Sequence, residues 1–204
     1  VDTVAGLQAT GRHPTYDGLL AEGDTDFAWV YPQDEWESIA LNYTSGTTGR
    51  PKGVVYHHRG AYLNAMGQVI SWRIVMNPVY LTIVPLFHCN GWCHTWLMPA
   101  VGGTIACCRD IVAKDIYRII ADEKVTHFGG APIVLNMLIN APEADRRDFD
   151  HVVEVFTAGA PPAPATLAKI EPLGFNITHV YGLTETYGPA TECTWRSKWD
   201  DPKG

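Results

Sequence analysis

The chain has 204 residues, of which 46% are apolar and 18% are charged, and it carries a formal net charge of −7. This balance is typical of a globular domain and excludes a disordered polymer, and the acidic charge argues against nucleic acid as a partner, because there is no broad basic footprint to neutralise phosphates. No stretch reaches the roughly 20 apolar residues of a membrane span, and the amino terminus does not resemble a signal peptide, so we expect no membrane span and a cytoplasmic location.

From Ser38 onward, short apolar runs alternate with stretches of helical spacing. The preceding residues are acidic and turn-rich, and Trp29 and Trp36 are expected to be packing anchors there. Strands are predicted for IALNYT, GVVYHH, VYLTIVP, GGTIACC, VTHFGGA, VVEVFTAGA and NITHVYG, and helices for 59–75, 112–123, the segment opened by Pro132, and 163–170. This alternation predicts an α/β fold with a mainly parallel sheet flanked by helices. Ligands collect at the carboxyl ends of such strands, which directs attention to the loops at 44–53, 158–162 and 182–188.

The first of these loops lies in YTSGTTGRPKG, residues 43–53. Its glycines allow close approach of the backbone to a ligand, and its hydroxyls and Lys52 suit phosphate oxygens. A Walker-type loop is excluded by register, because Pro51 occupies the glycine position before the lysine and Gly53 occupies the Ser/Thr position after it. A flexible surface loop is the other reading of such a composition.

YTSGTTGRPKG closely resembles the phosphate-binding signature of the adenylate-forming (AMP-binding) superfamily, which includes acyl-CoA synthetases, peptide-synthetase adenylation domains and luciferases. Two further matches follow in the family's order. PLFHCNGW, residues 85–92, resembles the aromatic and histidine motif at the acyl pocket, and YGLTET, residues 181–186, resembles the adenine and magnesium motif. Gly159, Ala160 and Pro161 resemble the segment that packs against adenine. The resemblance spans roughly residues 38–190.

This resemblance implies a set of site residues. Those that would bind ATP are Thr44, Ser45, Gly46, Thr47, Thr48, Gly49, Lys52, Gly159, Ala160, Pro161, Tyr181 and Gly182. Thr184 would contact the α-phosphate and Glu185 would hold Mg²⁺. His88 would lie beside the reacting carboxylate, with Trp92 and Gly159 bordering the acyl group. His88 and Trp92 are four residues apart, so one helical turn would place them on the same face.

The implied reaction is the ATP-dependent conversion of a carboxylic acid to acyl-AMP, followed by thioester formation with CoA. Within the family, the motifs look most like acyl-CoA ligases for short or medium acids, a group that includes methylmercaptopropionate-type ligases. A peptide-synthetase adenylation domain and a non-catalytic nucleotide-binding module remain alternatives. The chain reads as a partial AMP-binding domain over 1–204, with a lead-in over 1–37, a binding core over 38–190 and no small carboxyl-terminal domain, so by itself it is expected to adenylate poorly or not at all.

Five cysteines, an odd number, favour reduced thiols over a disulfide framework. His88, Cys89, Cys93 and His94 superficially suggest a metal site. The second half of a zinc site is missing, however, because adjacent Cys107 and Cys108 would point to opposite faces of a strand. Ordinary thiols are therefore the favoured interpretation.

Overall fold

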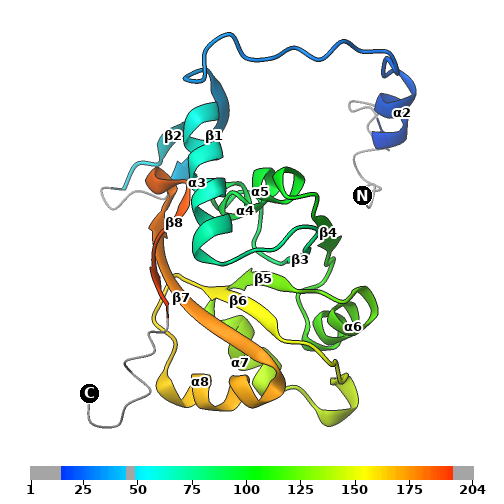
Figure 1. Ribbon diagram of the computed structural model, residues 1–204, viewed down its shortest axis with the longest axis vertical. Helices are drawn as coiled ribbons and strands as arrows, with labels where there is room; N and C mark the ends of the chain where they lie inside the picture. The colour runs from blue at the N-terminus through cyan, green and yellow to red at the C-terminus, as the bar shows by residue number, and fades with distance from the viewer. Residues whose placement is uncertain (1–14, 45–48, 195–204) are drawn as a thin grey trace. The chain divides into compact units, whose positions relative to one another are not determined.

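A computed structural model of the protein describes residues 15–44 and 49–194. The chain divides into two compact units, Val1–Gln33 and Asp34–Gly204. In the first unit, helix α2 (Tyr16–Ala21) begins after Thr15, whose Oγ1 accepts a hydrogen bond from Gly18 N at 3.0 Å. The fold that bears on function lies in the second unit (Figure 1).

The second unit begins with an antiparallel hairpin of β1 (Ser38–Thr44) and β2 (Lys52–His57). Both strands were predicted, but they form a sheet of their own rather than part of the parallel sheet. The connection between Thr44 and Lys52 is too short for the crossover that parallel strands need, so the two strands pair directly. The phosphate-loop candidate therefore lies at a hairpin turn, and the expectation that it follows a strand of the parallel sheet is wrong.

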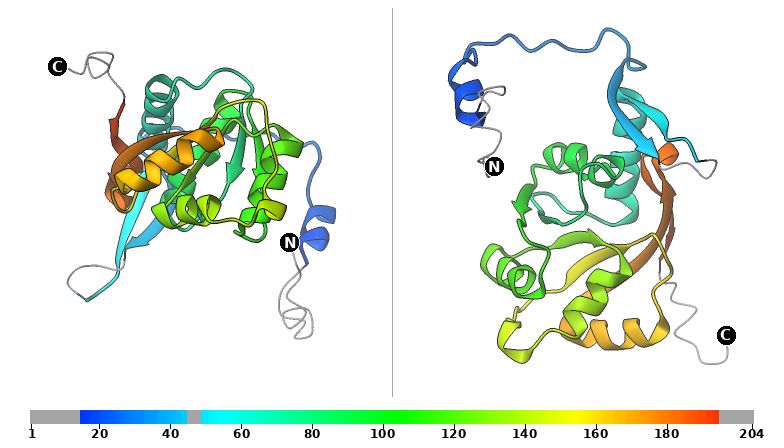
Figure 2. Two further views of the ribbon diagram at one scale, coloured as in Figure 1. Left: turned by 90° about the horizontal axis from the view of Figure 1, so that it is seen from below. Right: turned by 180° about the vertical axis from the view of Figure 1, so that it is seen from behind.

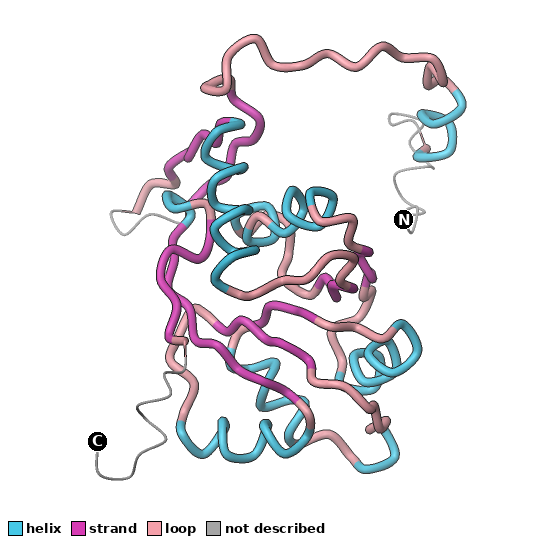
Figure 3. Tube along the Cα trace, viewed as in Figure 1, coloured by secondary structure: helices cyan, strands magenta, loops and turns pink. Residues whose placement is uncertain are grey.

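The main sheet has six strands in the order β4-β3-β5-β6-β7-β8 (Figures 1 and 3). The strands are β3 (Val79–Thr82), β4 (Thr104–Cys107), β5 (His127–Gly130), β6 (Val153–Thr157), β7 (Phe175–Leu183) and β8 (Gly188–Cys193). All neighbouring strands are parallel except β7 and β8, which form an antiparallel pair. The predicted α/β class with a mainly parallel sheet is confirmed.

Helices cover both faces of this sheet (Figure 2). Those in the second unit are α3 (His58–Ser71), α4 (Cys89–Trp92), α5 (His94–Ala100), α6 (Ala113–Glu123), α7 (Pro132–Ile139) and α8 (Pro164–Ile170), with 3-10 turns η1 (Glu143–Asp145), η2 (Glu171–Leu173) and η3 (Thr184–Thr186). Helices α6, α7 and α8 pack on one face, and α3 and α5 pack on the other. Pro132 opens α7 in the first turn, as predicted.

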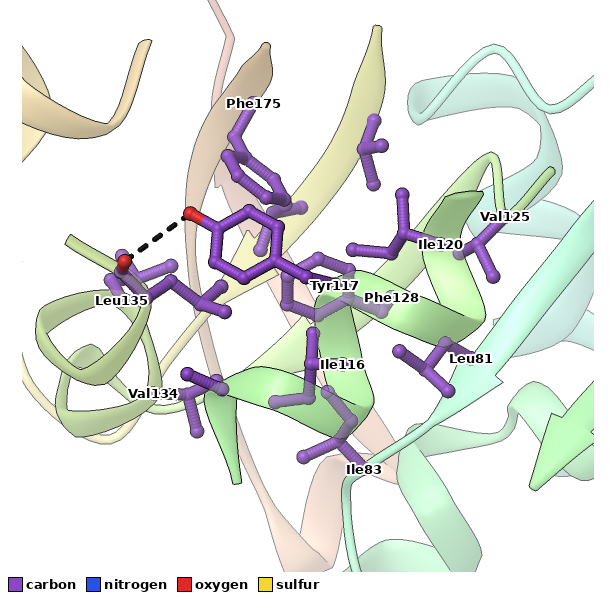
Figure 4. Close-up of a cluster of buried hydrophobic side chains, with 14 of the residues drawn as sticks. Leu81, Ile83, Ile116, Tyr117, Ile120, Val125, Phe128, Val134, Leu135 and Phe175 are labelled. Atoms are coloured by element: carbon purple, nitrogen blue, oxygen red, sulfur yellow. Dashed lines mark hydrogen bonds between the residues drawn. The ribbon is translucent and has the colours of Figure 1, made fainter. Parts of the chain in front are cut away.

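Side chains alternate between the two faces of each strand, so the sheet contributes side chains to a hydrophobic core on each face. Tyr80 and Leu81 are adjacent on β3 and are both buried, but Leu81 belongs to the core under α6 and α7, and Tyr80 to the core under α3 and α5. Figure 4 shows the first core, in which Ile116 and Ile120 of α6 lie one turn apart and pack inward. The hydroxyl of Tyr117 there donates to Leu138 O at 3.2 Å, so its buried polar atom is satisfied.

Two sequence expectations about tryptophan and helix length differ from the structure. Trp29 is 83% exposed and Trp36 is 61% exposed, so neither is a buried anchor. Trp36 instead lies against the His57 ring, with 4.6 Å between ring centroids. Helix α3 ends at Ser71 rather than Val75, because Arg73 takes a left-handed conformation with φ of 54° and turns the chain out of the helix.

Candidate active site

A cavity of about 750 Å³ lies where four parallel strands end. It is bordered by residues that follow β3, β5 and β6 and by the end of β7, which is where ligands bind in sheets of this kind. Five of the predicted site residues line it together: His88, Trp92, Gly159, Gly182 and Thr184. Three separate motifs, up to 96 residues apart (184 − 88), therefore contribute to one cavity.

The remaining predicted residues lie outside this lining. Tyr181 is 60% exposed on β7, and Glu185, next to Thr184 in η3, is also exposed. Ala160 and Pro161 are exposed beyond Gly159. Their assigned roles remain predictions.

The phosphate-loop candidate is held at both ends by the hairpin. Thr44 at the end of β1 is paired in register with Lys52 at the start of β2, so these two residues face each other across the strands. Gly49 has φ of 85°, a conformation that favours glycine. Ser45, Gly46, Thr47 and Thr48 lie outside the described residues.

His88 and Trp92 are joined by a left-handed turn, not by the right-handed helical turn that their spacing suggested. Residues 89 to 93 all have positive φ, between 47° and 70°, and only Gly91 among them is glycine. Left-handed conformations cost non-glycine residues about 1–2 kcal/mol each, so the surroundings must hold this turn in place. The expected common helical face is wrong, although both side chains still border the cavity.

Close backbone approach fixes the position of Trp92. A Cβ on Gly129 would stand 3.1 Å from two carbons of the Trp92 ring, and a Cβ on Gly188 would stand 3.1 Å from Trp92 Cα. Gly188 itself has φ of 128°. A Cβ on Gly182 would overlap the carbonyl of Gly188, so β7 and β8 can approach at this point only because residue 182 is glycine.

Tyr56, which is buried, and Tyr187, which is half-buried, connect the hairpin to the segment YGLTET at residues 181–186. The Tyr56 hydroxyl donates to Thr184 O at 2.6 Å, and the Tyr56 ring stacks on Tyr187 with 4.1 Å between centroids. The Tyr187 hydroxyl in turn accepts from His57 N at 3.0 Å. The sequence analysis missed Tyr56 and Tyr187. Their contact partners are 128 and 130 positions away along the chain, and no local sequence pattern indicates contacts over such separations.

Titratable groups near the cavity are kept neutral by burial. Burial raises the pKa of the Tyr56 phenol and that of the Cys89 thiol, and it raises the pKa of Cys93 to about 12. Cys93 Sγ donates to Tyr187 O at 3.1 Å. Both thiols are therefore protonated at neutral pH, and within the described parts of the chain no group of three His, Cys, Asp or Glu side chains could hold a metal ion.

The sheet topology and the cavity define an α/β protein with a ligand-sized cavity at the carboxyl ends of its parallel strands, and comparison with known proteins names the family. A family model described as AMP-binding enzyme matches residues 5–204, so the chain belongs to the AMP-binding enzyme family. The chain is 50% identical over 186 residues to the acetate/butyrate–CoA ligase AAE7, peroxisomal, of Arabidopsis thaliana, and 50% identical over 186 residues to the acetate–CoA ligase CCL3 of Humulus lupulus. Each match covers 91% of this chain and 33% of the relative, so the chain spans about a third of the length of these curated relatives.

Solved structures agree on the fold. The N-terminal domain of FACL13 from Mycobacterium tuberculosis matches with a TM-score of 0.76 at 23% identity, covering 93% of this chain and 51% of that one. O-succinylbenzoate coenzyme A synthetase from Bacillus subtilis, solved in complex with ATP and magnesium ion, matches with a TM-score of 0.74 at 25% identity, covering 87% of this chain and 37% of that one. The resemblance to the adenylate-forming superfamily is confirmed.

The expected cytoplasmic location is wrong. AAE7 and the probable acyl-activating enzyme 5 of Arabidopsis thaliana, which is 49% identical to this chain, are both named as peroxisomal. The expectation rested on the lack of an apolar span and of a signal-peptide pattern, and neither feature reports on the receptor-read addresses that direct proteins to the peroxisome. Separately, none of the helices in the described segments is long and apolar enough to cross a bilayer.

Proposed function

We propose that this chain forms the nucleotide- and acid-binding core of an ATP-dependent carboxylate–CoA ligase, within a longer parent protein. The observation that carries the proposal is the single cavity bordered by His88, Trp92, Gly159, Gly182 and Thr184. The names of the relatives, which are acid–CoA ligases, support the same reaction. We keep residues 38–190 as the binding core and 1–37 as its lead-in.

The reaction has two steps, in which the chain's residues bind and orient the reactants. A carboxylate oxygen attacks the α-phosphorus of ATP, the bond to the bridging oxygen breaks, and pyrophosphate leaves. The CoA sulfur then attacks the acyl carbon, AMP leaves, and the thiol proton passes to solvent. In the first step, Thr44 and Lys52 would hold the β- and γ-phosphates from the two sides of the hairpin turn, and Thr184 would contact the α-phosphate.

Magnesium fits the residues at the edge of the cavity. Glu185 presents an exposed carboxylate directly after Thr184, which lines the cavity. Mg²⁺ is usually held by one or two carboxylates together with waters and substrate phosphates, so a single glutamate suffices on the protein side. When bound, the ion would neutralise charge on the phosphate oxygens.

The proposed substrates are short to medium carboxylic acids. Relatives are named for acetate, butyrate and 2-methylpropanoate, and the Trp92 ring, which lines the cavity and packs against Gly129, would limit the length of the acyl chain. We further propose the peroxisome as the compartment of the parent protein, following the two relatives named as peroxisomal.

The test is product analysis with the parent protein. ATP, Mg²⁺ and CoA are supplied with acetate, butyrate, 2-methylpropanoate or octanoate, and acyl-CoA, AMP and pyrophosphate are quantified by chromatography. We expect the three products in equal amounts with at least one acid. ADP and phosphate as products would contradict the proposal, AMP release that requires a carrier protein in place of CoA would favour a peptide-synthetase domain, and nucleotide binding without turnover would favour a non-catalytic module.

A further inference from the structure

The left-handed turn at residues 89–93 is held by one contact from helix α3 and one from the residues that directly follow the turn. Gln68 Nε2 of α3 donates to Trp92 O at 3.0 Å, and Thr95 Oγ1 donates to Asn90 O at 3.0 Å. Asn90 has φ of 47° and ψ of 45°, a conformation that asparagine tolerates better than most residues. The turn is thus pinned at its backbone, and the side chain of Asn90 is left to make a contact of its own.

That contact is with Asn42. Asn42 Nδ2 donates to Asn90 Oδ1 at 2.7 Å, and Asn42 is only 4% exposed on β1. Asn42 lies two residues before Thr44, where the phosphate-loop candidate begins, and Asn90 lies two residues after His88. One partly buried hydrogen bond therefore joins the strand that leads into the phosphate loop to the turn that carries His88 and Trp92.

We propose that Asn42 and Asn90 form a positioning pair that sets the acid-binding turn relative to the phosphate loop. The inference rests on the proposed function. Adenylation needs the carboxylate oxygen and the α-phosphorus in line and about 3–3.5 Å apart, and a displacement of about 1 Å can slow such a step on the order of 100-fold. Asn42 and Asn90 touch no reacting atom in this scheme and act only through the segments they join.

A hydrogen bond suits this task better than apolar packing at the same place. An amide pair has a preferred distance and direction, so it fixes the register of the two segments as well as their separation. Removing the Asn90 side chain leaves the buried Asn42 amide without its partner, and removing Asn42 releases the half-buried Asn90 side chain, so in either case β1 and the turn lose the contact that aligns them. Movement of β1 relative to the turn changes the distance between the two halves of the site.

The test is a double-mutant cycle in the parent protein with Asn42→Ala, Asn90→Gly and the double variant. Glycine is used at residue 90 because it adopts positive φ without a penalty, so that only the side chain is removed. The readout is acid-dependent exchange of pyrophosphate into ATP, giving kcat and separate KM values for the acid and for Mg·ATP. We expect each single variant to lower kcat by about 10- to 100-fold and to raise the KM for the acid, with the KM for Mg·ATP changed less than about twofold.

The decisive result of the double-mutant cycle is whether the effects of the two substitutions are coupled. The double variant should lose no more activity than the worse single variant, because the pair acts as one contact. Asn90→Asp keeps an acceptor oxygen for Asn42 Nδ2 and should retain nearly full activity. Asn140→Ala changes an exposed asparagine at the end of α7 and is the matched control, with no expected effect.

Several outcomes would contradict the positioning role of Asn42 and Asn90. Losses that multiply in the double variant, single variants with unchanged kinetics, or equal increases in both KM values would each remove the positioning role, as would losses that vanish after correction for the folded fraction. If Asn42→Ala does not fold, Asn42→Thr, which suits a strand but cannot reach Asn90, replaces it. An unmutated parent without acid-dependent exchange would defeat the proposed function itself, whereas an active parent with additive variants defeats only this inference.

Discussion

Gly60 on α3 faces the ring of Tyr187: a Cβ on Gly60 would overlap the phenol carbons and the hydroxyl oxygen. The ring cannot move aside freely, because it stacks on Tyr56 and its hydroxyl accepts from His57 N. Because residue 60 has no side chain, the turn that carries Tyr187 can pack directly against α3.

This contact reverses the usual effect of a glycine-to-alanine change in a helix. We predict that Gly60→Ala destabilises the protein by about 1–3 kcal/mol, as overpacking does. Gly67→Ala on the same helix meets no atom within 4 Å and should stabilise by about 0.5–1 kcal/mol through helix propensity. Urea denaturation gives the free energy of unfolding of both variants. Equal changes at the two positions would contradict the contact between residue 60 and Tyr187.

Trp92 should limit the length of the acid. Trp92 has φ of 58°, so Trp92→Gly removes the ring without straining the backbone. We expect this variant of the parent protein to gain activity toward longer acids relative to acetate, by roughly 3- to 4-fold in kcat/KM per added methylene that enters the freed space, which corresponds to about 0.8 kcal/mol each. A series from acetate to octanoate measures the slope, and an unchanged chain-length preference would show that the ring does not border the acyl group.

Glu185 should act through Mg·ATP. We expect Glu185→Gln in the parent protein to raise the KM for Mg·ATP, or to lower kcat/KM for it, on the order of 10-fold or more, with a smaller effect on the acid. Glu123→Gln, at an exposed position at the end of α6, is the matched control and should behave like the unmutated protein. Unchanged dependence on ATP and Mg²⁺ would remove Glu185 from the metal site.

Two buried histidines should make the fold sensitive to acid. Burial lowers the pKa of His94 to about 3 and that of His127 to about 4, against an ordinary value of 6.5. The unfolded chain therefore binds protons first, so stability is complete above about pH 6.5 and falls as the pH drops from there toward the folded-state values, by up to about 1.4 kcal/mol per pH unit for each histidine.

Unfolding free energies measured between pH 4.5 and 7.5 test this sensitivity. His94→Phe should flatten the decline, because the aromatic contacts of His94 with Trp72 and Tyr80 can be kept without a titrating group. Leu97→Ala, a buried change on the same helix, should lower stability at every pH and leave the slope unchanged. A slope that His94→Phe does not alter would contradict the burial argument.

The sequence allowed much of the sheet to be predicted, because β3 through β7 are short apolar runs separated by helices of clear period. Pairing partners were harder to predict, since alternation along a strand assigns faces but not neighbours. For β1 and β2 the deciding factor was the short connection between Thr44 and Lys52, which permits only an antiparallel pair.

The candidate site likewise has features that could be predicted from the sequence and features that could not. It could be predicted that His88, Gly159 and Thr184 come together, because they belong to motifs with an ordered spacing, and all three line the cavity. The left-handed turn that places Trp92 could not be predicted, because four of its five residues are not glycine and distant residues such as Gln68 and Asn42 hold its conformation. Tertiary hydrogen bonds of this kind override local backbone preference and leave no local pattern in the sequence.

The most direct measurement for the central proposal is exchange of radiolabelled pyrophosphate into ATP by the parent protein, with Mg²⁺ and without CoA. Formation of an acyl-AMP intermediate predicts exchange that appears only when a suitable short or medium acid is added, and that is abolished when the acid is replaced by the corresponding alcohol. No exchange with any acid, in a protein that nevertheless forms acyl-CoA, would contradict activation through an adenylate.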